Sequence, residues 1–244
     1  MMKINIKNLA VKSLLMAAIV LFIFPSCNDD ILDEKPLDFL SPDNAYLTEA
    51  GALQGITALH DRVRSAYYSF GEFGVMNWAT HGSDLGYNGE TPGPGGSYLN
   101  SYADMTPVWR NVIATWNVGF EIIQWANVLI DRVESADPEA FSDGEAGKSK
   151  YIAEARFFRG FAYRYLVSTY GDIPLLTEPI NSAKADFIRN PVADIHDLMV
   201  EDFQFAANNL PKPGEEDAPG RITQGPAWHY LAETYLEQDD FQNA

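Results

Sequence analysis

The chain combines a core-forming composition with a large excess of acids. Of its 244 residues, 46% are hydrophobic and 21% charged, with 34 acidic residues against 17 basic ones, so it is no disordered acidic tail. The net charge of −17 argues against nucleic-acid binding, because phosphate contacts need clustered Lys and Arg. The single cysteine excludes an internal disulfide and a thiolate zinc site.

Residues 1–26 have the pattern of a signal peptide. Lys3, Lys7 and Lys12 form a basic head, and an apolar run of 11 residues extends from Leu14 to Phe24. A bilayer-spanning helix needs roughly 20 apolar residues, so this run is too short to span. We therefore expect it to be a secretory segment.

Cys27 follows the apolar run directly behind Ser26, an arrangement that resembles a bacterial lipobox with Phe24 in place of the usual Leu. In a lipobox the cysteine is lipidated and begins the mature chain, and each buried methylene of its acyl chains contributes about 0.8 kcal/mol to membrane binding. The alternative is an unmodified thiol beside an ordinary cleavage site.

Residues 27–40 are predicted to form an acidic tether. Pro36 interrupts any regular element there, and charged and apolar residues alternate. Asn28-Asp29-Asp30 resembles the surface-export signal of some Gram-negative lipoproteins, the alternative being a solvated acidic linker.

Helical periodicity and helix-end signals predict an all-α fold for residues 41–244, without a strand series. The first helix begins at Ser41-Pro42-Asp43, an N-cap signal, and buries a stripe of Leu53, Ile56, His60, Val63 and Tyr67. The later helices are expected over residues 109–133, 149–170, 192–210 and 223–238.

Four polar residues on these helices or just after them are expected to serve structure rather than chemistry. His60 is predicted to be a hydrogen-bonded core histidine, and Asn127, on an apolar face, needs a partner for its amide. Glu154 is expected to pair within its helix or with a neighbouring one, and Asp172 to cap a turn.

Residues 70–107 are predicted to be a long loop, because glycines and prolines break every periodic run. Loops of this length are usually functional or disordered, and the aromatic content of this one argues against disorder.

The last two predicted helix pairs carry a degenerate tetratricopeptide-like repeat. The spacing of Trp228, Leu231, Ala232 and Tyr235 matches that of four residues 70 positions earlier: Phe158, Phe161, Ala162 and Tyr165. The units cover about 149–211 and 223–244, and Trp116 and Trp228 are expected to lie in the core.

Three sequence stretches together resemble the SusD/RagB family of outer-membrane glycan-binding lipoproteins. The first is Trp116-x3-Phe120-x2-Ile123-x2-Ala126-Asn127. The second runs from E-A-R-F-F-R-G-F at 154–161 through Y-G-D-I-P-L-L at 170–176, and the third is G-R-I-T at 220–223, which leads into Ala227-Trp228. The resemblance implies a SusD-like helical scaffold with long irregular loops. Family members are markedly longer, so we expect the chain to be an amino-terminal part, incomplete at its C-terminus.

The resemblance further implies an outward-facing outer-membrane lipoprotein that binds oligosaccharide and delivers it to a SusC-like TonB-dependent transporter without cleaving bonds. Flat rings cover the apolar faces of pyranoses, and amides and carboxylates bind hydroxyls. In the early loop the candidate ligand-binding residues are Asn77, Trp78, Asp84, Tyr87 and Asn88. The alternative for each ring is packing of its own loop, and no residue indicates which glycan is bound.

No enzyme, metal or cofactor motif is complete. Residues 82–86 miss the nucleophile elbow, since Ser83 occupies the second position instead of the third, and the four histidines are scattered. Asp84, Asn88 and Glu90 match no calcium loop, while paired acids for glycoside hydrolysis depend on distances in space. The alternative function is a lipid-anchored repeat scaffold that binds protein only.

Overall fold

The computed structural model describes residues 45–67, 83, 84, 86 and 106–244. The predicted signal peptide 1–26, the tether 27–40 and most of the loop 70–107 lie outside the described residues. All the described residues belong to the compact unit Pro42–Ala244.

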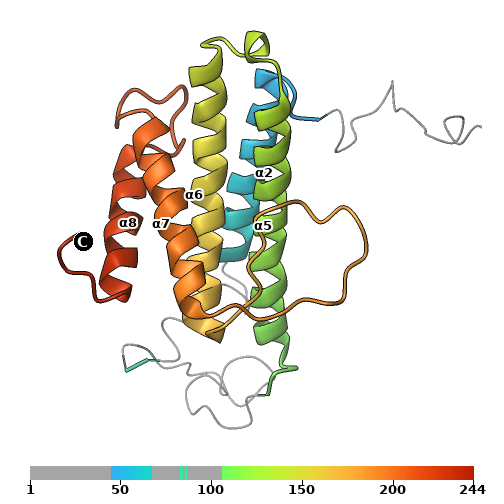
Figure 1. The fold of residues 1–244 in the computed structure, drawn as a ribbon, viewed down its shortest axis with the longest axis vertical. Coiled ribbons are helices and arrows are strands. Elements are labelled where there is room, and N and C mark those ends of the chain that lie inside the picture. Colours follow the sequence, from blue (N-terminus) through green and yellow to red (C-terminus); the bar gives the residue numbers. More distant parts are fainter. Residues whose placement is uncertain (1–44, 68–82, 85, 87–105) are drawn as a thin grey trace, which may run out of the picture. The chain divides into compact units, whose positions relative to one another are not determined.

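The described part of this unit is built from α-helices, which confirms the predicted fold class (Figure 1). In those residues β-pairing is limited to an isolated bridge between Ile173 and Asn190. The five α-helices, with one short 3-10 turn (Pro138–Ala140) between the second and third, are α2 (Glu49–Tyr67), α5 (Arg110–Ser135), α6 (Glu145–Tyr170), α7 (Val192–Asn209) and α8 (Gln224–Glu237).

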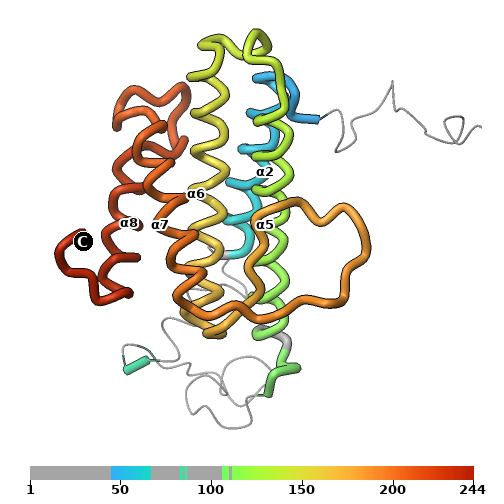
Figure 2. Tube along the Cα trace, viewed as in Figure 1, coloured from blue at the N-terminus to red at the C-terminus, as the bar shows by residue number. Residues whose placement is uncertain are grey.

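Helix α6 is the centre of the bundle. It packs against α5 and α2 on one side and α7 on the other, and α8 packs on α7 (Figure 2). Of its 26 residues, 16 are buried, the charged Lys148, Glu154 and Arg159 included, as expected of a helix surrounded by others. Close approach depends on small residues, since Gly119 of α5 faces Leu166 and Gly160 faces Phe203 of α7. No described helix is both long and apolar enough to cross a membrane.

The start of α2 differs from the prediction. The helix begins at Glu49 instead of near Ser41, because residues 45–48 form a turn in which Tyr46 has a φ of 67°. Thr48 takes over the capping, since its Oγ1 accepts a 3.2 Å hydrogen bond from the Gly51 N–H.

The buried stripe of α2 is also partly different from the prediction. Ile56 and Val63 are buried as expected, but Leu53 is exposed. The reason is that α2 meets α5 through a neighbouring face, on which Gly55 approaches Leu129 of α5. The other buried apolar residues of this face are Ala52 and Leu59.

The remaining helix ends lie close to the predicted ones. Helix α6 ends at Gly171, whose φ of 69° is left-handed and whose N–H bonds the Val167 carbonyl at 2.9 Å. Its start, at Glu145, lies four residues before the predicted Ser149. Asp172 does not cap a local turn as predicted, because its Oδ1 accepts from the Val192 N–H, 20 residues away at the start of α7 (3.1 Å).

The prediction that Trp228 lies in the core is wrong, because its side chain is 49% exposed. The buried residues of α8 are instead Ala227, Leu231 and Thr234. Tyr230, two residues after Trp228, supplies the ring that packs against the aromatic cluster of α6 and α7. The repeat spacing therefore places Leu231 correctly, since it is buried, and Trp228 wrongly. Trp116 is half-buried and lies edge-on to Tyr170, with ring centroids 5.1 Å apart.

We predict that Gly160→Ala destabilises the bundle. An added Cβ would lie 2.9 Å from Cζ of Phe203, a buried ring with no room to retreat. Overpacking of this kind costs about 1–3 kcal/mol of unfolding free energy, measurable by urea titration. The matched control is Gly225→Ala in α8, whose nearest neighbour would be 3.8 Å away, so its effect stays under about 1 kcal/mol. Equal stability of the two variants would show that the α6–α7 contact is not tight.

Candidate functional site

The ligand residues predicted in the early loop lie almost entirely outside the described residues. Asp84 is described and its side chain is exposed. The other four, Asn77, Trp78, Tyr87 and Asn88, fall in the undescribed ranges, as does the predicted lipidation site Cys27. The juxtaposition of these residues therefore stays a prediction.

The described residues contain an irregular segment whose backbone is held by side chains from two helices. This segment, residues 173–180, begins the connection between α6 and α7. Asn127 of α5 donates its amide hydrogens to the carbonyls of Leu176 (3.0 Å) and Glu178 (3.2 Å). Gln124, one turn earlier, accepts from the Ile180 N–H at 3.0 Å and donates to the Ile180 carbonyl at 3.3 Å.

Tyr163 of α6 completes this set of contacts. Its hydroxyl accepts from the Leu176 N–H (2.6 Å) and donates to the Leu176 carbonyl (3.1 Å). Burial raises the pKa of Tyr163, so the hydroxyl keeps its proton and remains a donor. Side chains thus satisfy backbone groups that a helix or sheet would otherwise pair.

A buried ion pair orients Asn127. Arg159 of α6 donates from Nε and Nη2 to the two carboxylate oxygens of Asp202 on α7, at 2.8 and 2.7 Å. Its Nη1 donates to Asn127 Oδ1 at 2.8 Å and to the Thr177 carbonyl at 3.3 Å. Burial lowers the pKa of Arg159, but its hydrogen bonds to Asp202 outweigh this effect and raise it. The guanidinium therefore stays charged and joins α5, α6, α7 and the segment.

The held segment, Phe187 and α5 line an open pocket of about 400 Å³, here called the loop pocket. Trp116 and Phe120, one turn apart on α5, have ring centroids 4.7 Å apart. Phe187 is 42% exposed, an unusual position for a phenylalanine. The lining residues are Trp116, Phe120, Gln124, Pro174, Leu176, Ile180 and Phe187.

A second pocket, of about 330 Å³, lies between α2, α6 and the start of α8. Its rings Phe157, Phe158 and Phe161 are almost fully buried and offer a ligand little surface. His60 and Arg64 of α2 also line it, and Arg64 is already paired with Asp61 at 2.8 Å. The loop pocket is therefore the stronger candidate for a binding site in the described part of the chain.

A second buried charge cluster surrounds Glu154, whose side chain is 1% exposed. Its Oε1 lies 2.7 Å from His60 Nε2 of α2 and accepts from the Ile222 N–H at 3.2 Å. Its Oε2 accepts from Arg221, with Nε at 2.7 Å and Nη2 at 2.6 Å. The prediction that Glu154 pairs with a neighbouring helix is confirmed. His60 is hydrogen-bonded as predicted, but it is half-buried and does not lie in the core.

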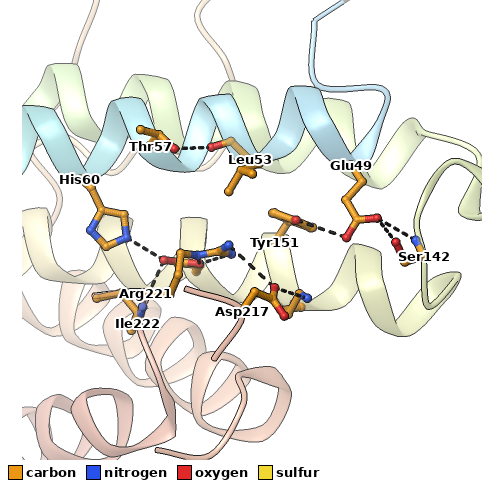
Figure 3. A network of polar contacts seen from close by, with 11 residues as sticks. Glu49, Leu53, Thr57, His60, Ser142, Tyr151, Asp217, Arg221 and Ile222 are labelled. Atoms are coloured by element: carbon orange, nitrogen blue, oxygen red, sulfur yellow. Dashed lines mark hydrogen bonds and ion pairs between the residues drawn. The ribbon is translucent and has the colours of Figure 1, made fainter. Parts of the chain in front are cut away.

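The cluster continues along the bundle, as Figure 3 shows for His60, Arg221, Asp217, Tyr151 and Glu49. Asp217 accepts from Lys150 of α6 at 2.6 Å and lies 3.9 Å from Arg221. Arg221 also lies over the Tyr151 ring, 5.3 Å from its centroid. The cluster thus fastens the segment before α8 to α6 and α2.

The buried charged groups around Glu154 and Asp202 stabilise the fold and do not form a catalytic site. Glu154 and Asp202 are each held by a guanidinium, so neither is available as a general acid or base. Within the described ranges, no three His, Cys, Asp or Glu side chains gather so that they could hold a metal ion. What the described residues offer a ligand is aromatic surface in a rigid concavity.

We predict an acid-sensitive contribution from Glu154. Burial raises its pKa, but hydrogen bonds from His60 and Arg221 outweigh burial and hold the pKa below its usual value. These pairs therefore stabilise the fold above the unfolded-state pKa of roughly 4.3, and this stabilisation is lost as pH falls through the lower folded-state pKa. At about pH 7, Glu154→Gln should cost about 3 kcal/mol, because Arg221 is left buried without its partner.

Urea unfolding of wild type and variant between about pH 7 and pH 3 checks this prediction. The difference in unfolding free energy should shrink below about pH 4. Asp186→Asn, at an exposed acid on the connection between α6 and α7, is the control and should follow the wild type. A difference that stays constant across this range would contradict the assignment.

Comparison with known proteins places the fold in a family. A family model described as "Starch-binding associating with outer membrane", of SusD-like type, matches residues 95–236. SusD-like protein P25 of Formosa agariphila is 24% identical over 95% of this chain and 44% of its own length. A SusD-like protein of Bacteroides ovatus is 27% identical over 94% of this chain and 40% of its own.

Solved structures agree with this match. A laminarin-binding SusD-like protein has a TM-score of 0.71 at 25% identity, covering 81% of this chain and 42% of the neighbour. Surface glycan-binding protein A of Bacteroides fluxus shares the fold, with a TM-score of 0.66 at 20% identity over 79% of this chain and 41% of the neighbour. The chain spans less than half the length of these relatives. Because the family model covers more than half of the chain, the chain belongs to the SusD-like family.

Proposed function

We propose that this chain is part of a surface glycan-binding lipoprotein. It binds oligosaccharide without cleaving it and delivers it to a SusC-like TonB-dependent transporter in the outer membrane. The observation that carries the proposal is the match of residues 95–236 to a starch-binding, outer-membrane-associated family. The laminarin-binding neighbour supports a glucose polymer as the ligand class.

The charges of the chain are compatible with this function. A net charge of −17 repels anionic polymers but leaves neutral glycans unaffected.

The early loop is proposed to supply the main glycan contacts. Trp78 and Tyr87 would cover apolar sugar faces, and Asn77, Asp84 and Asn88 would bind hydroxyls. The exposure of Asp84 supports this role.

A second candidate function is a protein-binding repeat scaffold. Three large apolar side chains on and just after α8 are exposed: Trp228, Leu236 and Phe241. Apolar side chains gathered at a surface favour contact with protein. A scaffold would bind the transporter but no sugar.

Isothermal titration of the full chain with laminarin and starch oligosaccharides separates the two functions. We expect the wild type to bind at least one of them, and Trp78→Ala to weaken that binding about tenfold, as loss of ring contacts implies. The melting temperature should remain nearly unchanged, because the ring is expected to face the ligand. Absence of binding by the wild type to either glycan would contradict the proposal and favour the scaffold.

The anchor is tested by fractionation of cells that express the chain. Cys27→Ala removes the only thiol that can be acylated, so the protein should move from the membrane fraction to the soluble fraction. Cys27→Ser, which also lacks the thiol, should behave in the same way. Retention of either variant at the membrane would contradict a lipid anchor at this residue.

A further inference from the structure

We propose that the loop pocket is a glycan subsite that takes the apolar face of one sugar ring, separate from the residues of the early loop. The inference rests on the proposed function, since it assigns part of the glycan binding to residues 116–187. All lining residues lie within the stretch that matches the family model, whereas residues 77–88 lie outside it.

The lining is chemically matched to a pyranose face. Such a face presents C–H groups, which pack favourably on the face of an aromatic ring. Three of the seven lining residues are aromatic, namely Trp116, Phe120 and Phe187. The volume of about 400 Å³ falls in the range of small-ligand sites, about 300–1,000 Å³.

Gln124 is the one polar residue in the lining, and its hydrogen bonds restrict how a sugar can bind. Both ends of the Gln124 amide are committed to the Ile180 backbone. A deeply buried hydroxyl would therefore lack a partner, at a cost of about 1–3 kcal/mol. A ring that rests its face on the aromatic lining keeps its hydroxyls in water and avoids this cost. We thus infer that the sugar ring stacks on the aromatic lining and makes no specific hydrogen bonds to the pocket. Such binding tolerates different glycosidic linkages.

Exposed charged residues lie on the same connection as the pocket residue Phe187. Lys184 lies over the Phe187 ring, with Nζ 5.6 Å from its centroid, and Glu178 and Asp186 are also exposed on the same connection. An aromatic contact area with polar groups beside it suits a ligand that is apolar on its faces and polar at its edges.

One wall of the pocket, the backbone of residues 176–180, is also preformed. Asn127, Gln124 and Tyr163 hold the backbone of residues 176–180 in place before any ligand arrives. Binding then avoids the free-energy cost of ordering a loop, which otherwise subtracts from affinity. This arrangement allows even a small stacking contact to contribute measurably.

The test uses the full chain and the laminarin and starch oligosaccharides of the binding experiment. Phe187→Ala removes the exposed ring and should weaken binding roughly three- to tenfold. Ile180→Trp fills the pocket while leaving the backbone bonds to Gln124 intact, and should weaken binding similarly. Ile188→Ala is the matched control, since Ile188 is adjacent, 73% exposed and not part of the lining. Circular dichroism should be unchanged in all three.

The outcomes separate this inference from the proposed function. If the wild type binds a glycan and Phe187→Ala and Ile180→Trp bind it equally well, the subsite is overturned while glycan binding stands. If these variants keep full glycan affinity but lose contact with a protein partner, the pocket is a protein-docking site and the inference fails. If the wild type binds neither oligosaccharide, both proposals fail.

Discussion

The buried pair of Arg159 and Asp202 is the interaction on which the rest of the structure depends. Asp202 is fully buried, and its carboxylate meets a two-pronged guanidinium at 2.7 and 2.8 Å. Removing one partner of such a pair costs about 3–5 kcal/mol, because the other charge stays buried. The third guanidinium nitrogen orients Asn127, so one side chain fixes the positions of three helices and of the segment after Gly171.

This arrangement explains why an irregular connection is a rigid part of the molecule. Residues 176–180 have no regular partner strand or helix turn, yet Asn127, Gln124 and Tyr163 satisfy their backbone groups. Rigid backbone beside the aromatic face of α5 produces a preformed concavity. The proposed glycan subsite therefore depends on the same polar contacts that hold the bundle together.

Local sequence signals predict the helices well, but they predict contacts between distant residues poorly. Gly171 ended α6 as expected, and the need of Asn127 for a partner was evident from its apolar face. Its actual partners, Leu176, Glu178 and Arg159, lie 32 to 51 residues away, and local patterns do not encode such pairings. Trp228 is exposed although its spacing matches the repeat, because Tyr230 supplies the ring that contacts α6 and α7. The loop pocket was not predicted, since its residues come from separate elements.

Amide hydrogen exchange tests the central claim, that side chains hold the segment after α6 rigid, most directly. The Leu176 N–H donates to the Tyr163 hydroxyl and the Ile180 N–H to Gln124. The account predicts protection of these two amides approaching that of the α6 core, in the absence of any ligand. Exchange at the rate of an unstructured exposed loop would contradict it, and with it the preformed pocket.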